Sequence, residues 1–153
     1  IEGTSLIKTT SLANAKIVRL DFFRKPIEKI PILHAPPDVS PITFLLGSEG
    51  ESESKVVEAH LSYQPIDTND FSTYSIKTTD AAFKELKDGK GYVAAITDKT
   101  KKDISIQKVY QAYYLGPSMQ KFLLPIFVFE GGDGFVGFVS AIDNSWINEN
   151  GSP

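Results

Sequence analysis

The strongest constraint on the fold is the stretch from Asp103 to Ile142, in which runs of β-branched and aromatic residues are separated by turn residues. Gly116-Pro117 ends the first run, and the cluster Gly131-Gly132-Asp133-Gly134 ends the second. Strands are rich in β-branched and aromatic residues, whereas Gly, Pro and Asp mark the turns between them. The stretch therefore predicts three successive antiparallel strands, a β-meander.

The middle run, Phe122 to Phe129, is apolar at both parities, which is typical of a strand covered on both faces. Its predicted faces are Phe122, Leu124, Ile126 and Val128 on one side, and Leu123, Phe127 and Phe129 on the other. In the preceding strand Ile104 and Ile106 share a face, but Val109 has the opposite parity. We therefore expect a β-bulge near Gln107-Lys108.

The N-terminal part of the chain predicts three further strands, over residues 16–24, 42–46 and 55–63. The last of these would carry four apolar side chains on one side, namely Val57, Ala59, Leu61 and Tyr63. Prolines are frequent between Lys25 and Pro41, and because proline removes backbone donors, the segment 30–34 can form at most an edge strand.

One helix is predicted, over Thr79 to Lys87. Thr78 or Thr79 can cap its first turn, Asp80 suits the positive end of the helix dipole, and Gly89 can adopt the left-handed conformation that ends a helix. Its apolar stripe is short, so the helix is expected to cover one face of a sheet. The fold class is α+β: mostly antiparallel sheet, arranged in meanders, with one principal helix.

A chain of 153 residues is long enough to bury its own core, and a single domain over residues 1–153 is expected. Two related halves, 1–73 and 74–143, are suggested by the repeat of Ile7-Lys-Thr-Thr10 as Ile76-Lys-Thr-Thr79. The sequence has no apolar run near the ~20 residues needed to cross a bilayer. It begins at Ile1 rather than Met, so we expect it to be the soluble part of a longer protein, with an anchor upstream.

The charge balance argues against nucleic acid as a partner. The net charge is −3, and acidic and basic residues are interspersed except in two short tracts, Glu49 to Glu53 and Lys99 to Lys102. Such tracts are typical of solvated turns, and a nucleic-acid-binding domain would be basic. The chain contains no cysteine, which excludes disulfides and thiolate chemistry.

The motifs of the second half resemble a known family. They are Tyr74-Ser-Ile-Lys-Thr78, Ala81 to Leu86, Gly89-Lys-Gly91, Ile104 to Tyr114, Phe122 to Gly131 and Phe135 to Ala141. Over residues 74–142 the chain is similar to the C-terminal part of YycI-type (YycH/YycI-like) regulatory proteins and, more distantly, to PepSY-like domains. YycI-type proteins restrain a membrane sensor kinase, and PepSY-like segments are associated with peptidase inhibition.

The resemblance implies an extracytoplasmic domain, tethered by an N-terminal membrane helix, that regulates a sensor kinase or another envelope protein by contact. It implies no catalytic residues, and we expect neither a cofactor nor a metal. The alternative is a small hydrolase or ligand-binding domain that uses His60 with nearby acidic residues. The sequence has no G-x-S-x-G, H-E-x-x-H or P-loop motif, and we interpret His34 and His60, with Glu58 and Ser62 beside the latter, as structural or solvated residues.

Several acidic residues could in principle act chemically. The carboxylates that could provide hard oxygen ligands for calcium are Asp67, Asp70, Asp133 and Asp143. They lack the spacing of an EF-hand loop, and turn formation is the favoured interpretation. Glu130 follows the apolar middle run and is either a strand-end turn residue or a carboxylate with a perturbed pKa.

The aromatic residues and one strand margin are the candidate partner-binding site. The aromatic set is larger than one face of a sheet needs, so it serves as core or as part of a groove for a partner strand. If the sheet ends at the strand 135–141, its unpaired edge could pair with a second copy or a regulatory target. The candidate residues are Tyr110, Tyr113, Tyr114, Phe135, Gly137 and Val139.

Overall fold

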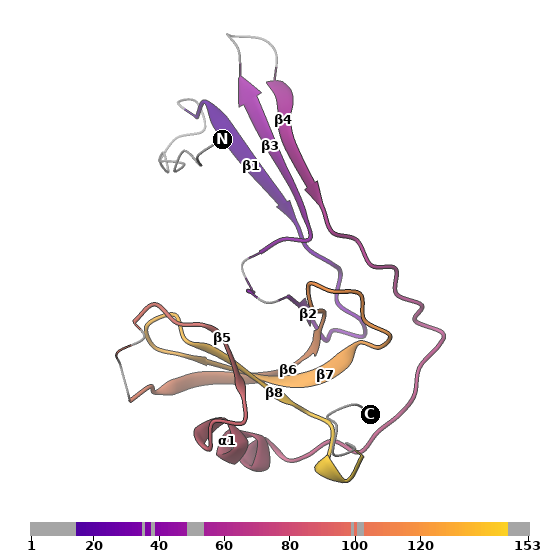
Figure 1. Cartoon of the computed structure of the whole chain (residues 1–153), viewed down its shortest axis with the longest axis vertical. Coiled ribbons are helices and arrows are strands. Elements are labelled where there is room, and N and C mark those ends of the chain that lie inside the picture. The colour runs from indigo at the N-terminus through magenta and orange to yellow at the C-terminus, as the bar shows by residue number, and fades with distance from the viewer. Residues whose placement is uncertain are drawn as a thin grey trace. The chain divides into compact units, whose positions relative to one another are not determined.

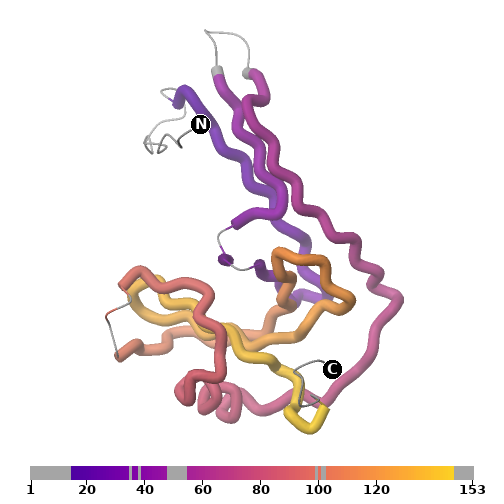
Figure 2. The backbone as a smooth tube through the Cα atoms, in the orientation of Figure 1, coloured from indigo at the N-terminus to yellow at the C-terminus, as the bar shows by residue number. Residues whose placement is uncertain are grey.

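The computed structural model describes residues 15–34, 36–37, 39–48, 54–98, 100 and 103–146. It divides into two compact units, each built on one sheet. Unit 1 comprises Ile1–Phe23 and Ser40–Tyr63, and unit 2 comprises Arg24–Val39 and Gln64–Pro153. The backbone therefore leaves unit 1 after Phe23, returns at Ser40 and leaves again after Tyr63 (Figure 2).

Unit 1 is a three-stranded antiparallel sheet in the order β1-β3-β4 (Figure 1). Its strands are β1 (Ile17–Phe22), β3 (Ile42–Ser48) and β4 (Ser54–Leu61). β3 is central, because Ile42 pairs with Phe22 on one side and with Leu61 on the other. The three strands predicted in the N-terminal part of the chain are confirmed, with differences only at their ends.

Ser40 joins the end of β1 to the start of β3. Its side chain is buried, and its hydroxyl oxygen accepts hydrogen bonds from the backbone N–H groups of Phe22 (3.0 Å) and Ile42 (3.2 Å). The same oxygen lies 2.8 Å from the carbonyl oxygen of Phe22 and 2.7 Å from that of Ile42. A hydroxyl has one hydrogen, so it donates to one of these carbonyls at a time.

Unit 2 contains a five-stranded sheet in the order β2-β6-β7-β8-β5. Its strands are β2 (Ile32–Leu33), β5 (Tyr92–Ala95), β6 (Ile106–Tyr114), β7 (Leu124–Gly131) and β8 (Val136–Ser140). The antiparallel order β6-β7-β8 is the predicted meander. β2 pairs in parallel with β6 and lies at the margin of the sheet, which confirms that the proline-rich segment supplies only an edge strand.

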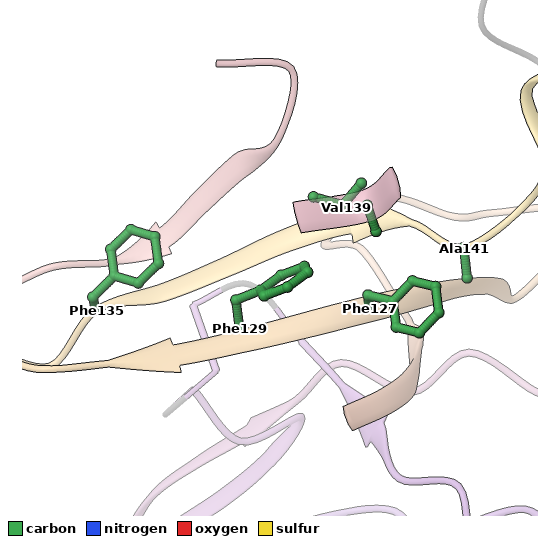
Figure 3. Packing of buried hydrophobic residues seen from close by; sticks show 6 residues of the cluster. Phe127, Phe129, Phe135, Val139 and Ala141 are labelled. Atoms are coloured by element: carbon green, nitrogen blue, oxygen red, sulfur yellow. The ribbon is translucent and has the colours of Figure 1, made fainter. Parts of the chain in front are cut away.

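β7 is covered on both faces, as its apolar pattern predicted. Phe127 and Phe129 belong to one buried cluster, with Phe135, Val139 and Ala141 (Figure 3). Ile126 and Val128 belong to a second cluster on the other face, and the side chains of Val128 and Phe129 are fully buried. The strand begins at Leu124, so Phe122 and Leu123 precede it, and Phe122 is half exposed.

The predicted bulge in the first meander strand is confirmed. Ile106 pairs with Gly131 and Lys108 with Glu130, which leaves Gln107 without a partner across the strand pair. This extra residue explains why the alternation of apolar side chains changes parity between Ile106 and Val109.

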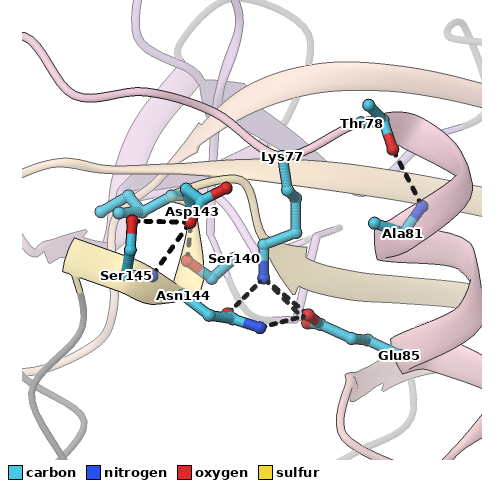
Figure 4. Close-up of polar contacts among 9 residues, drawn as sticks. Lys77, Thr78, Ala81, Glu85, Ser140, Asp143, Asn144 and Ser145 are labelled. Atoms are coloured by element: carbon cyan, nitrogen blue, oxygen red, sulfur yellow. Dashed lines mark hydrogen bonds and ion pairs between the residues drawn. The ribbon is translucent and has the colours of Figure 1, made fainter.

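The α-helix α1 (Thr79–Lys87) has the predicted bounds and is the only α-helix among the described residues. Its N-cap is Thr78, whose hydroxyl accepts a hydrogen bond from the N–H of Ala81 at 3.2 Å (Figure 4). Gly89 has the positive φ, 73°, that the predicted helix stop requires. Ala82 is buried against the sheet and Phe83 stacks on Phe129, so α1 covers the face that Figure 3 shows.

The two halves that the sequence suggested contain meanders of the same strand order, β1-β3-β4 and β6-β7-β8. In each meander an isoleucine of the first strand pairs with a glycine of the second strand: Ile17 pairs with Gly47, and Ile106 pairs with Gly131. A helix covers the meander of unit 2, whereas no described helix belongs to unit 1. Common ancestry of the two halves stays a prediction.

Candidate interaction surface

One face of the unit 1 sheet carries nine apolar residues, and the pair Ser48–Ser54 ends the same face. Residues that pair across antiparallel strands lie on the same face, so the register assigns the side chains without ambiguity. Every second residue of β1 lies on this face. The residues of β3 that pair with them lie on the same face, and so do the residues of β4 that pair with those β3 residues. The apolar face therefore consists of Val18, Leu20, Phe22, Ile42, Phe44, Leu46, Val56, Ala59 and Leu61.

The residues of this apolar face on the outer strands are mostly exposed, and those on the central strand β3 are partly exposed. The relative exposures are 39% for Leu20, 51% for Phe22, 60% for Val56 and 62% for Leu61. Within the face, Phe22 and Phe44 form an edge-to-face pair with 6.0 Å between ring centroids. None of the nine residues belongs to the buried core of the chain. Unit 1 therefore has a sheet whose apolar side lacks a second layer among the described residues.

The opposite face of the same sheet is mainly polar. The residues of this polar face with ionisable or hydroxyl side chains are Arg19, Asp21, Thr43, Lys55, Glu58 and His60. Asp21 accepts a hydrogen bond from Thr43 at 2.8 Å and pairs with Arg19 at 2.9 Å. The hydrogen bond from Thr43 and the Arg19 guanidinium lower the pKa of the Asp21 carboxyl. The charges of the sheet therefore lie on this polar face, whereas the nine positions of the apolar face carry none.

A β-bulge in β4 changes the face that the sequence predicted for Val57. Leu45 pairs with Glu58 and Leu46 with Val56, so Val57 is the extra residue. Val57 lies over Gly47 on the polar face, because a Cβ placed on Gly47 would come within 2.8 Å of Val57 Cγ2. The prediction that Val57 shares a face with Ala59 and Leu61 is therefore wrong, and Val56 takes that position.

Sequence reasoning did not identify the apolar face, although part of its signal is present in the sequence. Val18, Leu20 and Phe22 alternate with Ile17, Arg19 and Asp21, which is the period of a strand with one apolar side. In β4 the bulge interrupts this period, so the matching apolar positions are evident only once the register is known.

Models of protein families, curated protein sequences and solved structures give no match to this chain. The resemblance to YycI-type regulators and PepSY-like domains therefore stays a prediction. In the part of the chain that the structure describes, no helix has the length and apolar character needed to span a membrane.

The predicted open margin at the strand 135–141 is wrong. β8 pairs with β7 on one side and with β5 on the other, through Val93 opposite Gly137 and Tyr92 opposite Phe138. Phe135, Gly137 and Val139 are buried. The sequence could not show that β8 is paired on both sides. β5 precedes the meander in the chain, and the composition of β5 does not indicate which margin of the meander it joins. The margins of this sheet are β2 and β5.

The three predicted tyrosines lie on β6 and are half-buried. Tyr110 donates a hydrogen bond to Glu130 Oε1 at 2.7 Å, and burial together with the Glu130 carboxylate raises the pKa of its hydroxyl. Tyr114 packs edge-on against Phe138, and burial raises its pKa as well. Tyr113 has the opposite parity and faces the other side of the strand. These side chains stabilise the sheet; their role in partner binding stays a prediction.

Glu130 is a strand residue rather than a turn residue. It belongs to β7, pairs in register with Lys108, and its Oε2 lies 3.4 Å from Lys108 Nζ. Lys108 also lies over the ring of Tyr110, with 4.4 Å between Nζ and the ring centroid. The carboxylate thus takes part in a partly exposed cluster with Lys108 and Tyr110.

The two histidines lie in different environments. His60 is exposed on β4, on the polar face beside Glu58 and Thr43. His34 follows β2, and its Nε2 is buried without a hydrogen-bond partner. Burial and the positive charge of Arg24 lower the pKa of His34. The histidines belong to separate units, His60 to unit 1 and His34 to unit 2.

The candidate calcium ligands form turns. Asp67 accepts a hydrogen bond from the N–H of Asn69, and Asp143 accepts one from the N–H of Ser145, each at 2.9 Å. Asp133 has a positive φ, 56°, in the turn before β8. Asp70 is exposed in the loop after β4. No group of three or more possible metal ligands occurs among the residues that the structure describes.

Buried Lys77 connects α1 to the short 3-10 helix η2 (Asn144–Trp146), which follows the meander (Figure 4). Lys77 Nζ lies 2.9 Å from both carboxylate oxygens of Glu85 and 2.9 Å from Asn144 Oδ1. Asn144 donates to Glu85 Oε1 at 2.9 Å, which closes the triangle. Burial alone would raise the pKa of Glu85, but hydrogen bonds from Lys77 and Asn144 outweigh this and lower it. All three side chains have partners, so this cluster is structural.

Proposed function

We propose that the chain is a non-enzymatic protein-interaction module that binds through the apolar face of the unit 1 sheet. The observation that carries this proposal is the set of nine apolar residues on one face of three adjacent strands, five of which are exposed and four partly exposed. Scattered apolar residues are normal on a protein surface, but a contiguous apolar patch marks a contact site.

The architecture of unit 1 supports a contact role for this face. A sheet with one apolar side reaches a stable arrangement by burying that side against a second layer, and a few strands alone are marginal in water. In unit 2 the corresponding layer is α1, which covers Phe129 and its neighbours. In unit 1 the apolar side has no such cover within the described residues, so we infer that a partner protein supplies the layer.

The biological setting is proposed from the sequence. The resemblance to YycI-type regulators spans residues 74–142, which fold as α1 to β8 of unit 2. By that resemblance the chain works outside the cytoplasm, tethered to the membrane, and regulates a sensor kinase or another envelope protein by contact. Unit 2 is the part of the chain to which this resemblance applies.

Photo-cross-linking tests the contact directly. A benzophenone amino acid is placed at Leu20 on the apolar face or at Arg19 on the polar face, in the full-length protein in the cells that make it. We expect a discrete cross-linked product from position 20 and little or none from position 19. Absence of product at position 20, or equal products at both positions, would overturn the proposal.

A further inference from the structure

We infer that the layer that covers the apolar face is the same face of a second copy of the chain. The inference rests on the proposed function, because it names the partner of that surface. The two sheets would form a β-sandwich about a twofold axis, with their layers ~10 Å apart as in other stacked sheets. Phe44 of the central strand lies near the middle of the face and would sit near the axis.

The composition of the face favours an identical partner. Its nine positions carry no charged or polar side chain, so they offer nothing to pair with a charged partner. A purely apolar surface is complementary to itself, and twofold interfaces are by far the commonest among oligomers. The charges of the same sheet lie on the polar face, so they would stay in water after the two copies associate.

No other face in the described part of the chain has this character. The unit 2 sheet carries Lys108 and Glu130 on one face and Gln111 on the other. Its strongly apolar positions, such as Val128 and Phe129, are already buried. The apolar face of unit 1 is therefore the surface of this chain that another copy can match position by position.

The size of the face sets the expected strength. Three strands ~4.8 Å apart, with about six residues each rising ~3.3 Å, cover on the order of 300 Å² of plane. Interdigitating side chains bury more accessible surface than the plane beneath them, and a specific interface clears about 1,000 Å² in total. Two apolar faces come near this lower limit, so we expect a reversible dimer that dissociates in the micromolar range.

Analytical ultracentrifugation of the full chain tests the inference, with two matched pairs of variants. Val56→Lys and Leu61→Lys each place a charge on the apolar face, while Val57→Lys and His60→Lys place it at a neighbouring, similarly exposed position on the polar face. Burying an unpaired lysine is costly, so each apolar-face variant should weaken dimerisation by at least about tenfold. Circular dichroism and thermal melting identify any variant that fails to fold, and the other pair then decides.

For the wild type and both polar-face controls, we expect a sedimenting mass that rises with concentration from the 16.8 kDa of one chain towards the mass of two chains. The two apolar-face variants should stay near the mass of one chain at the same concentrations. A wild type that stays a single chain throughout overturns the second-copy inference, and the proposed function then stands or falls by the cross-linking at Leu20. A dimer that all four variants retain also overturns the inference, because association then uses another surface.

Discussion

At the scale of single residues, the structure depends on a few polar side chains that satisfy backbone groups where the sheets end. Ser40 is the clearest case, because one buried hydroxyl serves the N–H groups and carbonyls of Phe22 and Ile42. These two residues are also the last pair in the register of β1 and β3. A buried backbone group left without a partner costs far more than an average hydrogen bond contributes.

Ser40→Ala should destabilise unit 1 by about 1–3 kcal/mol, since it removes the hydrogen-bond partner of partly buried backbone groups at Phe22 and Ile42. Native-state hydrogen exchange of the β1 and β3 amides measures this locally. Ser72→Ala, in an exposed loop, is the control and should change stability by less than about 0.5 kcal/mol. Unchanged exchange in the Ser40 variant would show that the hydroxyl does not hold the two strands together.

Glu28 and Lys29 form a two-residue turn in which both residues have positive φ, 48° and 74°. The turn joins Ile27 and Ile30, which exchange two backbone hydrogen bonds. Such turns favour Asn and Gly, because a side chain strains the left-handed conformation. Lys29→Gly should raise stability by up to about 1 kcal/mol.

The control for this turn is Lys25→Gly, since Lys25 is exposed and outside the turn. There glycine only adds freedom to the unfolded chain, so stability should fall by about 0.5–1 kcal/mol. Opposite signs for the two substitutions in thermal melting support the strained turn. A loss of stability in both would contradict it.

At the scale of elements, the sequence predicted what local patterns determine and missed what long-range pairing determines. The two-faced pattern of Phe127, Val128 and Phe129 identified the central strand, and the cap at Thr78 fixed the start of α1. The position of β5 beside β8 depends on a pairing between distant segments, which composition does not encode. Likewise, only the pairing register shows on which face of the unit 1 sheet Val56 lies.

Ile126→Ala should destabilise unit 2 by about 2–5 kcal/mol, because Ile126 is buried in β7 and its loss leaves a cavity. Trp146 is the only tryptophan and belongs to unit 2, so its fluorescence during denaturation reports this unit. Phe122→Ala, half exposed just before β7, is the control and should cost less than about 1 kcal/mol. Equal losses for both variants would show that β7 is not the central strand of the core.

The triangle of Lys77, Glu85 and Asn144 gives α1 a pH-dependent attachment. The pKa of Glu85 is lowered in the folded chain, so the folded state keeps this carboxyl ionised where the unfolded state protonates it. The resulting stabilisation is present above the ordinary pKa of 4.5 and is lost as the pH falls through the lowered folded value.

Glu85→Gln should therefore be less stable than the wild type at pH 7 and should lose less stability between pH 7 and pH 3. Denaturation curves followed through Trp146 at several pH values measure the two slopes. Asp21, Asp98 and Asp143 also have lowered pKa values, but they are the same in both proteins and cancel in the comparison. Parallel slopes would mean that the ion pair with Lys77 contributes nothing.

At the scale of the whole molecule, the two units differ in how they bury apolar surface. Unit 2 has a helix-covered sheet and two buried clusters, whereas unit 1 keeps the apolar face of its sheet exposed. The proposed contact role of the chain rests on this difference between the two units. The sequence predicted an interaction module, but its candidate residues lie on β6 and around β8, because the apolar face of unit 1 depends on a register that the bulge at Val57 conceals.

The most direct test of this account is hydroxyl-radical footprinting of the two faces of the unit 1 sheet, in the cell and in the dilute purified chain. We predict that Leu20, Phe22 and Leu61 are labelled strongly in the dilute chain and are protected in the cell. Thr43 and His60 on the polar face should be labelled to the same extent in both. Equal labelling of the apolar face in the two conditions would contradict the account, because no partner would then cover it.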